Sequence, residues 1–410
     1  MANYLDDRRE RKAQRVDEAL TSHVWTSTSA WSAHELRLLH VDIVYTDDIL
    51  NQKIGSAAVE NLQTILDAFQ YDVHEWDNLS RTLDNFENDF IKVHGHLASE
   101  FYLAMCRVAT TWNNVPEQES PLSVPAEQLQ AYVEHTGPAM PSTSGTSSEE
   151  SDNAQASSHS SKPRKAVSFS DNDASYESDS LRRSAAHGNF TKVRPAAARS
   201  IKESSSKEFV ETGSYKSSEK FALAMLIKAV LFMGRLKNLD CSMDHAAYRV
   251  RFGAPPGNGP RSINDGGVIL SRKLPKSNRV SIVNIKCTSP QGCTGPEAMS
   301  KIIAQEFGEM LAIVQERMNK TRHTSRRHVS ICTVHTIAMH GQRAYLTLAQ
   351  FKDDYLQGME FENLGTERVI VKRTESIYAL NSKEGLHDFI RVLYPLLYQL
   401  NEEIQCGRRY

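Results

Sequence analysis

Hydrophobic positions in the first third of the chain recur at helical spacing. One run predicts a helix through Val59, Leu62, Ile65, Leu66 and Phe69, and a longer run predicts a second through Leu79, Leu83, Phe86, Phe90, Val93, Leu97 and Phe101. Asp77 or Ser80 is expected to cap the second helix. The pattern predicts a helical module over residues 1–136, and no motif within it indicates chemistry.

Helical and strand patterns alternate in the C-terminal half. Helices are predicted over 221–239, 296–319 and 383–404, with a short one near Asp353, and strands over 246–252, 266–272, 279–287, 328–339, 343–350 and 368–373. The expected fold class is α+β, with a mixed C-terminal β-sheet flanked by helices in a domain of residues 221–410. Because the central strands are apolar on both sides, we expect helices to cover both faces of the sheet.

Serine clusters replace aliphatic residues between these two regions. Residues 137–220 contain SSEES, SSHSS and ESSSKE, together with prolines and acidic groups. Such a segment buries too little apolar surface to offset its chain entropy, so it is predicted to be a disordered linker. Its serines are candidate phosphorylation sites, and the alternative is a passive tether.

Charge is distributed unevenly along the chain. The overall net charge of −2 divides into −12 for residues 1–140, +1 for 141–220 and +9 for 221–410. A basic C-terminal domain favours a polyanionic partner, since phosphate neutralisation supplies most non-specific affinity for nucleic acid. The alternative is a solvated surface that balances the acidic N-terminal region.

Cellular location is predicted from what the sequence contains. The six cysteines form no paired framework, which suits a reducing compartment, and the charged N-terminus has no secretory signal. The most apolar run, residues 221–233, is too short to span a bilayer and contains Lys228, so we expect an intracellular soluble protein without membrane contact.

Basic clusters suggest two kinds of partner. Exposed clusters of this sort are recognised by nuclear import receptors and by nucleic acids, so we expect a nuclear protein that contacts DNA or RNA. The candidate import residues are Lys162, Arg164, Lys165, Arg182 and Arg183. The candidate nucleic-acid-binding residues are Arg272, Lys273, Lys276, Arg279, Lys320, Arg322, Arg326 and Arg327.

The strands at 266–272 and 279–287 carry the candidate chemistry. Asp265 precedes the first of them, and the second contains the triplet Asn284-Ile285-Lys286. Together with the runs IAQEFGEMLAIVQ and RAYLTLAQFKDDYLQGM that follow, this stretch resembles fungal proteins with PD-(D/E)XK nuclease-like domains.

The resemblance implies a restriction-endonuclease-like fold over roughly residues 221–405. Asp265 then matches the first acid of the family motif and Lys286 its lysine, while Asn284 stands where the second acid is expected. Gln305 matches the polar residue on the helix beside the site. A lone carboxylate would hold Mg²⁺ weakly, and Glu306 on that helix is the candidate to replace the missing one.

The sequence favours the first of three functions, and the other two are alternatives. The first is a nuclear regulator of gene expression that binds nucleic acid or chromatin-associated partners through a catalytically inactive nuclease-like domain, without a cofactor. The second is an active Mg²⁺-dependent nuclease that uses Asp265, Lys286 and Glu306. The third is an adaptor that binds only proteins, including an unidentified partner of the helical module. A purely structural alternative makes Asp265 a turn cap and Lys286 an exposed strand-end residue.

Overall fold

A computed structural model describes most of the chain outside the serine-rich region. The described residues are 25–47, 49, 54–112, 124–136, 207–244, 247–252, 259–271, 280–288, 295–322, 331–361 and 363–406. The predicted linker lies outside them up to residue 206. Its last residues, 207–220, belong to a helix instead, so the predicted linker boundary at residue 220 is wrong.

The N-terminal region is helical but contains one strand. Its elements are η1 (Thr28–Ala30), α2 (Ala33–Leu38), β1 (Val41–Tyr45), α3 (Ser56–Ala68), α4 (Val73–Thr82), α5 (Phe86–His94), α6 (His96–Trp112) and α7 (Ala126–His135). The predicted long second helix is broken into α4, α5 and α6. The breaks lie near Asn85 and Gly95, the N-cap and C-cap of α5, whose φ values of 67° and 87° do not fit a continuous helix. Ser80 lies inside α4, where its hydroxyl donates to the Asp77 carbonyl, so neither residue caps a helix.

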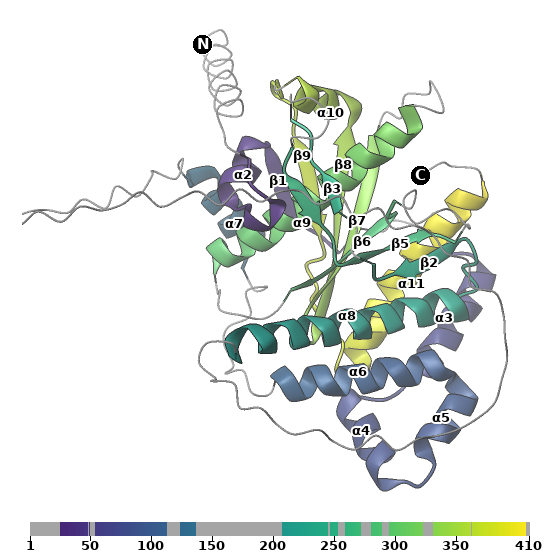
Figure 1. The fold of residues 1–410 in the computed structure, drawn as a ribbon. Coiled ribbons are helices and arrows are strands. Elements are labelled where there is room, and N and C mark those ends of the chain that lie inside the picture. Colours follow the sequence, from purple (N-terminus) through teal and green to yellow (C-terminus); the bar gives the residue numbers. More distant parts are fainter. Residues whose placement is uncertain are drawn as a thin grey trace, which may run out of the picture. The chain divides into compact units, whose positions relative to one another are not determined.

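The C-terminal region supplies most of the sheet. Its elements are α8 (Lys207–Met233), β2 (Leu239–Ser242), β3 (Ala247–Arg249), β4 (Arg261–Ile263), β5 (Gly266–Leu270), β6 (Val283–Thr288), α9 (Pro296–Arg322), β7 (Ile331–His340), β8 (Arg343–Lys352), α10 (Asp353–Glu360), β9 (Val369–Arg373), β10 (Tyr378–Ala379) and α11 (Lys383–Gln405). This is the predicted α+β class with a mixed sheet flanked by helices (Figure 1).

The main sheet has the strand order β1-β9-β8-β7-β6-β5-β2, and β10 pairs with β8. Strands β2, β5 and β6 are successively antiparallel, whereas β7 is parallel to β6 across the crossover helix α9. The predicted strand at 246–252 is not part of this sheet. It contributes β3, which pairs with β4 in a separate two-stranded sheet. The strand that pairs with β5 in the main sheet is β2.

Strand β1 joins the N-terminal region to the sheet. It pairs in parallel with β9, from Val41 opposite Val369 to Tyr45 opposite Arg373. The N-terminal residues and the C-terminal region therefore form one compact unit, and the expected separate helical module is not a domain of its own. Local sequence could not show this pairing, because the partner strand lies far along the chain.

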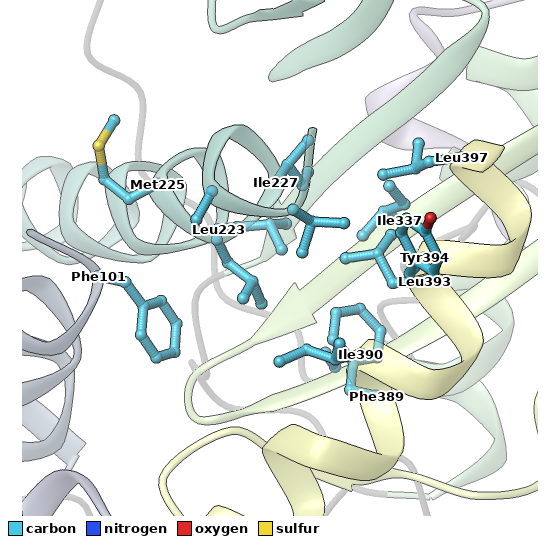
Figure 2. Packing of buried hydrophobic residues seen from close by; sticks show 14 of the residues in the cluster. Phe101, Leu223, Met225, Ile227, Ile337, Phe389, Ile390, Leu393, Tyr394 and Leu397 are labelled. Carbon is cyan, nitrogen blue, oxygen red and sulfur yellow. The ribbon is translucent and has the colours of Figure 1, made fainter. Parts of the chain in front are cut away.

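Helices cover both faces of the sheet, as the apolar strands predict. On one face Leu223 and Ile227 of α8 point toward Ile337 of β7 and toward Ile390 and Leu393 of α11 (Figure 2). On the other face α9 packs with α2 and α7, and its residues share a second apolar cluster with β7, β8 and β9. Among the described residues, no helix has the length and apolar character that crossing a membrane requires.

Close packing of α9 against the N-terminal segment depends on one glycine. A Cβ at Gly308 would lie 2.7 Å from Cγ2 of Thr28 and 2.9 Å from the Trp31 ring. A side chain at this position would therefore push α9 away from η1. The absence of one lets α9 approach closely, which fixes the helix over the sheet.

Candidate acid–lysine site

Strand β6 presents polar side chains to α9 and apolar ones to the opposite face. Val283, Ile285 and Cys287 belong to the apolar cluster on the α8 side. Because side chains alternate along a strand, Asn284 and Lys286 face the other way, toward α9. Both are buried, so the expectation of an exposed strand-end lysine is wrong.

Asp265 lies beside Lys286 at the start of β5. Gly266 pairs with Ile285, so Asp265 falls opposite the next residue of β6. Its Oδ2 accepts a 3.1 Å hydrogen bond from the backbone N–H of Cys287 and lies 3.7 Å from Nζ of Lys286. Its Oδ1 lies 3.7 Å from Nζ of Lys220 on α8. The structure therefore brings together the two residues that the nuclease resemblance assigned to one site.

The second carboxylate of the site comes from Glu309 on α9. Lys286 Nζ donates to Oε1 of Glu309 at 2.6 Å, and Asn284 Nδ2 donates to Oε2 at 2.9 Å. Gln305, one turn earlier on the helix, also contacts Oε1 at 3.5 Å. We call Asp265, Lys286 and Glu309 the acid–lysine set. Each of them is at most 2% exposed.

The charges of the set depend on one another. Burial alone would lower the pKa of Lys286, but the carboxylates of Glu309 and Asp265 outweigh it and raise the pKa of that ammonium. Burial raises the pKa of Glu309, and the ammonium of Lys286 opposes this shift. The lysine is therefore held charged between two acids.

Glu306, the predicted replacement acid, lies in a neighbouring network. The Tyr345 hydroxyl donates a hydrogen bond to Oε1 of Glu306, and Thr347 donates one to Oε2 at 3.1 Å. The ring of His340 contacts the same tyrosine hydroxyl at 2.6 Å. Burial raises the pKa of Glu306. The helix carboxylate in contact with Lys286 is thus Glu309, one turn beyond the predicted residue.

The sequence signal for Glu309 was present but ambiguous. Residues 306 and 309 are three apart on the helix, so they lie on the same side of it. Helical phase alone could not decide which of them reaches β6. The answer depends on how α9 lies over the sheet: Glu306 accepts a hydrogen bond from Thr347 of β8, and Glu309 accepts one from Asn284 of β6.

The donor set fits a hard divalent cation. Carboxylate oxygens of Asp265 and Glu309 are the ligands that Mg²⁺ prefers. Oδ1 of Asn284 is a further buried oxygen, and it has no hydrogen-bond partner among the described residues. Within the described part of the chain, no group of three or more His, Cys, Asp and Glu side chains is arranged for a metal. The site therefore offers two carboxylates and one amide oxygen.

The predicted basic contacts cannot be placed with this site. Arg272, Lys273, Lys276, Arg279, Arg326 and Arg327 lie outside the described residues, as do Lys162, Arg164, Lys165, Arg182 and Arg183. Lys320 and Arg322 belong to the last turn of α9, and their side chains are not described.

No protein-family model matches the chain, and a search of curated proteins found no significant match.

Proposed function

We propose that this chain has a restriction-endonuclease-like core and that the acid–lysine set hydrolyses phosphodiester bonds of nucleic acid with a divalent cation. The order of elements supports the fold: helix α8, the antiparallel strands β2, β5 and β6, helix α9, and then β7 parallel to β6. This is the order of helix, three-strand meander, helix and strand that the resemblance implies.

One observation carries the catalytic proposal. The carboxylate missing at Asn284 is supplied by Glu309, whose two oxygens contact the amide of that asparagine and the ammonium of Lys286. The neutral residue at position 284 was the reason to expect an inactive domain. In this proposal the second acid of the site comes from helix α9, through Glu309, and not from strand β6.

The chemistry follows from the roles of these side chains. A divalent cation bound at such a site polarises the phosphate and lowers the pKa of an attacking water. Asp265 and Glu309 would hold the cation, and Asn284 Oδ1 could complete the oxygen donors. Lys286 would stabilise negative charge that develops on the phosphate. The water oxygen would form a bond to phosphorus while the bond from phosphorus to the sugar oxygen breaks, and the proton that the water loses would end on the leaving sugar oxygen.

A second candidate is binding without cleavage, as in the nuclear regulator. It is favoured by the burial of the set and by the position of the Lys286 ammonium, 2.6 Å from one acid and 3.7 Å from the other. An ammonium there neutralises both carboxylates and competes with a cation. In this proposal the basic C-terminal region supplies the affinity, and the acid–lysine set stabilises the fold.

Cleavage of plasmid DNA and of structured RNA with Mg²⁺ or Mn²⁺ distinguishes the candidates. The wild-type protein should cut, and Asp265→Asn or Glu309→Gln should reduce cutting to background while a thermal melt shows that each variant is folded. The matched control is Glu297→Gln, which removes an exposed carboxylate from the same helix. Binding that weakens steeply with salt but without cleavage would favour the regulator. No binding at all would favour the protein adaptor.

Nuclear location is a separate proposal that rests on the sequence. Neutralising Lys162, Arg164, Lys165, Arg182 and Arg183 together should move a fluorescent fusion out of the nucleus. A cytoplasmic wild-type fusion would refute the proposed location.

A further inference from the structure

A row of polar residues crosses the sheet beneath α9. Tyr45 pairs with Arg373, Arg373 with Thr347, Thr347 with Thr336, and Thr336 with Asn284. The row therefore runs from β1 to β6 in register. One end lies at the acid–lysine set, and the other end lies at the edge of the sheet.

Arg373 has few hydrogen-bond acceptors for a buried guanidinium. The residue is 2% exposed, and its Cζ lies 3.5 Å from the centroid of the Tyr345 ring. Nη1 contacts the thioether sulfur of Met299 at 2.9 Å, which is a weak acceptor. Nη2 is buried and has no hydrogen-bond partner among the described residues. A buried charged donor without an acceptor is costly, so an anion bound at Nη2 would stabilise this guanidinium.

Tyr45 offers a second donor of the same kind beside it. Its Oη is buried and has no partner within the described residues, although the residue as a whole is partly exposed. Burial raises the pKa of Tyr45, so its hydroxyl keeps its proton and can donate. Tyr45 is the register partner of Arg373 on the adjacent strand. Two donors without partners therefore sit side by side at the strand ends.

The first turn of α9 lies over the same place. Met299, which contacts Arg373, belongs to that turn, and the helix is 27 residues long. Backbone N–H groups and the positive end of the helix dipole favour an anion at a helix start. The opposing charge is the carboxylate of Glu306, but Tyr345 and Thr347 already donate to its two oxygens.

These observations point to an oxyanion site, and we propose that Arg373 and Tyr45 bind a phosphate group of a nucleic-acid strand. The inference rests on the proposed function for its source of phosphate. Strands β6, β7, β9 and β1 run in the same direction. Lys286, Arg373 and Tyr45 therefore all lie near the carboxyl ends of their strands, on the same side of the molecule. Ligands of α/β sheets bind at the carboxyl ends of strands.

The distance between β6 and β9 means that the acid–lysine set and Arg373 would contact different phosphates. Three strand spacings separate β6 from β9, which amounts to about 14 Å. A phosphate at Arg373 is therefore distinct from one at Lys286. The phosphate site would position the strand, and the acid–lysine set would act on another phosphodiester of the same strand.

Titration of the full chain with inorganic phosphate, without divalent ions, tests the site. Phosphate should raise the melting temperature of the wild-type protein. Tyr45→Phe should melt at the wild-type temperature without phosphate, because the hydroxyl it removes has no protein partner, but should bind phosphate roughly tenfold more weakly. Arg373→Lys should weaken binding by at least about as much, because lysine lacks the planar fork.

The matched control is Lys372→Gln, which removes a positive charge from the same strand on the opposite face of the sheet. It should bind phosphate like the wild type. Binding that is absent in the wild type, or unchanged in Tyr45→Phe, would overturn the site.

A single-stranded oligonucleotide then identifies the source of the phosphate. It should compete with inorganic phosphate for the wild-type protein, and failure to compete would refute a nucleic-acid source in favour of free phosphate. Asp265→Asn should keep phosphate binding while it loses cleavage. The two proposals can therefore fail separately.

Discussion

Lys286 and Glu309 form a buried ion pair that joins strand β6 to helix α9, with 2.6 Å between Nζ and Oε1. If this pair separates, a charge remains unpaired in the poorly solvated interior. Such an unpaired charge costs several kcal/mol. The pair therefore fixes the part of α9 that carries the helix carboxylate over β6. It also brings that carboxylate next to Asp265, which lies 3.7 Å from the same ammonium.

The buried His340 should make the free energy of unfolding depend on pH. Burial, together with the charges of Arg373 and Lys286, lowers the pKa of His340 to about 3, against about 6.5 in an unfolded chain. Between these values the unfolded state binds one more proton, so stability is lost as the pH falls below about 6.5. From pH 7 to pH 5 the loss from this residue amounts to about 2 kcal/mol.

The comparison with His340→Gln isolates this contribution. Glutamine can donate to the Tyr345 hydroxyl as the imidazole does, but it does not titrate. Because Glu306 and Glu309 have raised pKa values and act in the opposite direction, the difference between the two proteins is the quantity to measure. Urea unfolding at both pH values should show a smaller loss for the variant. Equal losses would mean that His340 is protonated in the folded protein.

Replacing the side chain of Arg317 should cause a large loss of stability. Its buried guanidinium donates to the carbonyls of Ser281, Ile282 and Thr333, which joins the starts of β6 and β7. Arg317→Met leaves three carbonyls without this donor and should lower the free energy of unfolding by roughly 3–5 kcal/mol. Arg391→Met, on the exposed face of α11, should change it by less than about 1 kcal/mol. A similar effect of both substitutions in urea unfolding would contradict this role.

Sequence patterns predicted the elements that local residues determine. The strands at 266–272, 279–287, 343–350 and 368–373 and the helices at 296–319 and 383–404 correspond to β5, β6, β8, β9, α9 and α11, because their apolar periods are strong. The run VDIVY that forms β1 lies in an acidic helical context, and its pairing with β9 is decided by tertiary structure. Asp265 and Lys286 were found because the motif is local in the chain. Glu309 was missed because its role depends on the position of α9 over the sheet.

Pairing of β1 with β9 predicts that the two halves stay together after the chain is cut. A specific protease site inserted between residues 141 and 205 should yield two fragments that elute as one species from a sizing column. Strand β1 and the packing of α6 on α8 join them, and separation would expose apolar surface on both. A fragment of residues 207–410 expressed alone should aggregate. Separate elution of two folded fragments would restore the independent helical module.

Asn284→Asp tests whether position 284 faces a cation site. Nδ2 of Asn284 donates to Oε2 of Glu309 at 2.9 Å, so the substitution places a carboxylate against a carboxylate. In the presence of EDTA the variant should be less stable than the wild type by roughly 2–3 kcal/mol, because two like charges share a buried site.

Mn²⁺ or Mg²⁺ should reverse this loss, because a cation coordinated by both acids relieves the repulsion. At a hundred times its dissociation constant, an ion that binds only the folded state adds about 2.7 kcal/mol. Thermal melts with and without the ion should therefore show a larger ion-dependent rise for Asn284→Asp than for the wild type. The rise should disappear on adding Asp265→Ala, and the exposed control Asn381→Asp should behave like the wild type. An ion response equal to that of the wild type would mean that Asn284, Glu309 and Asp265 do not share a cation.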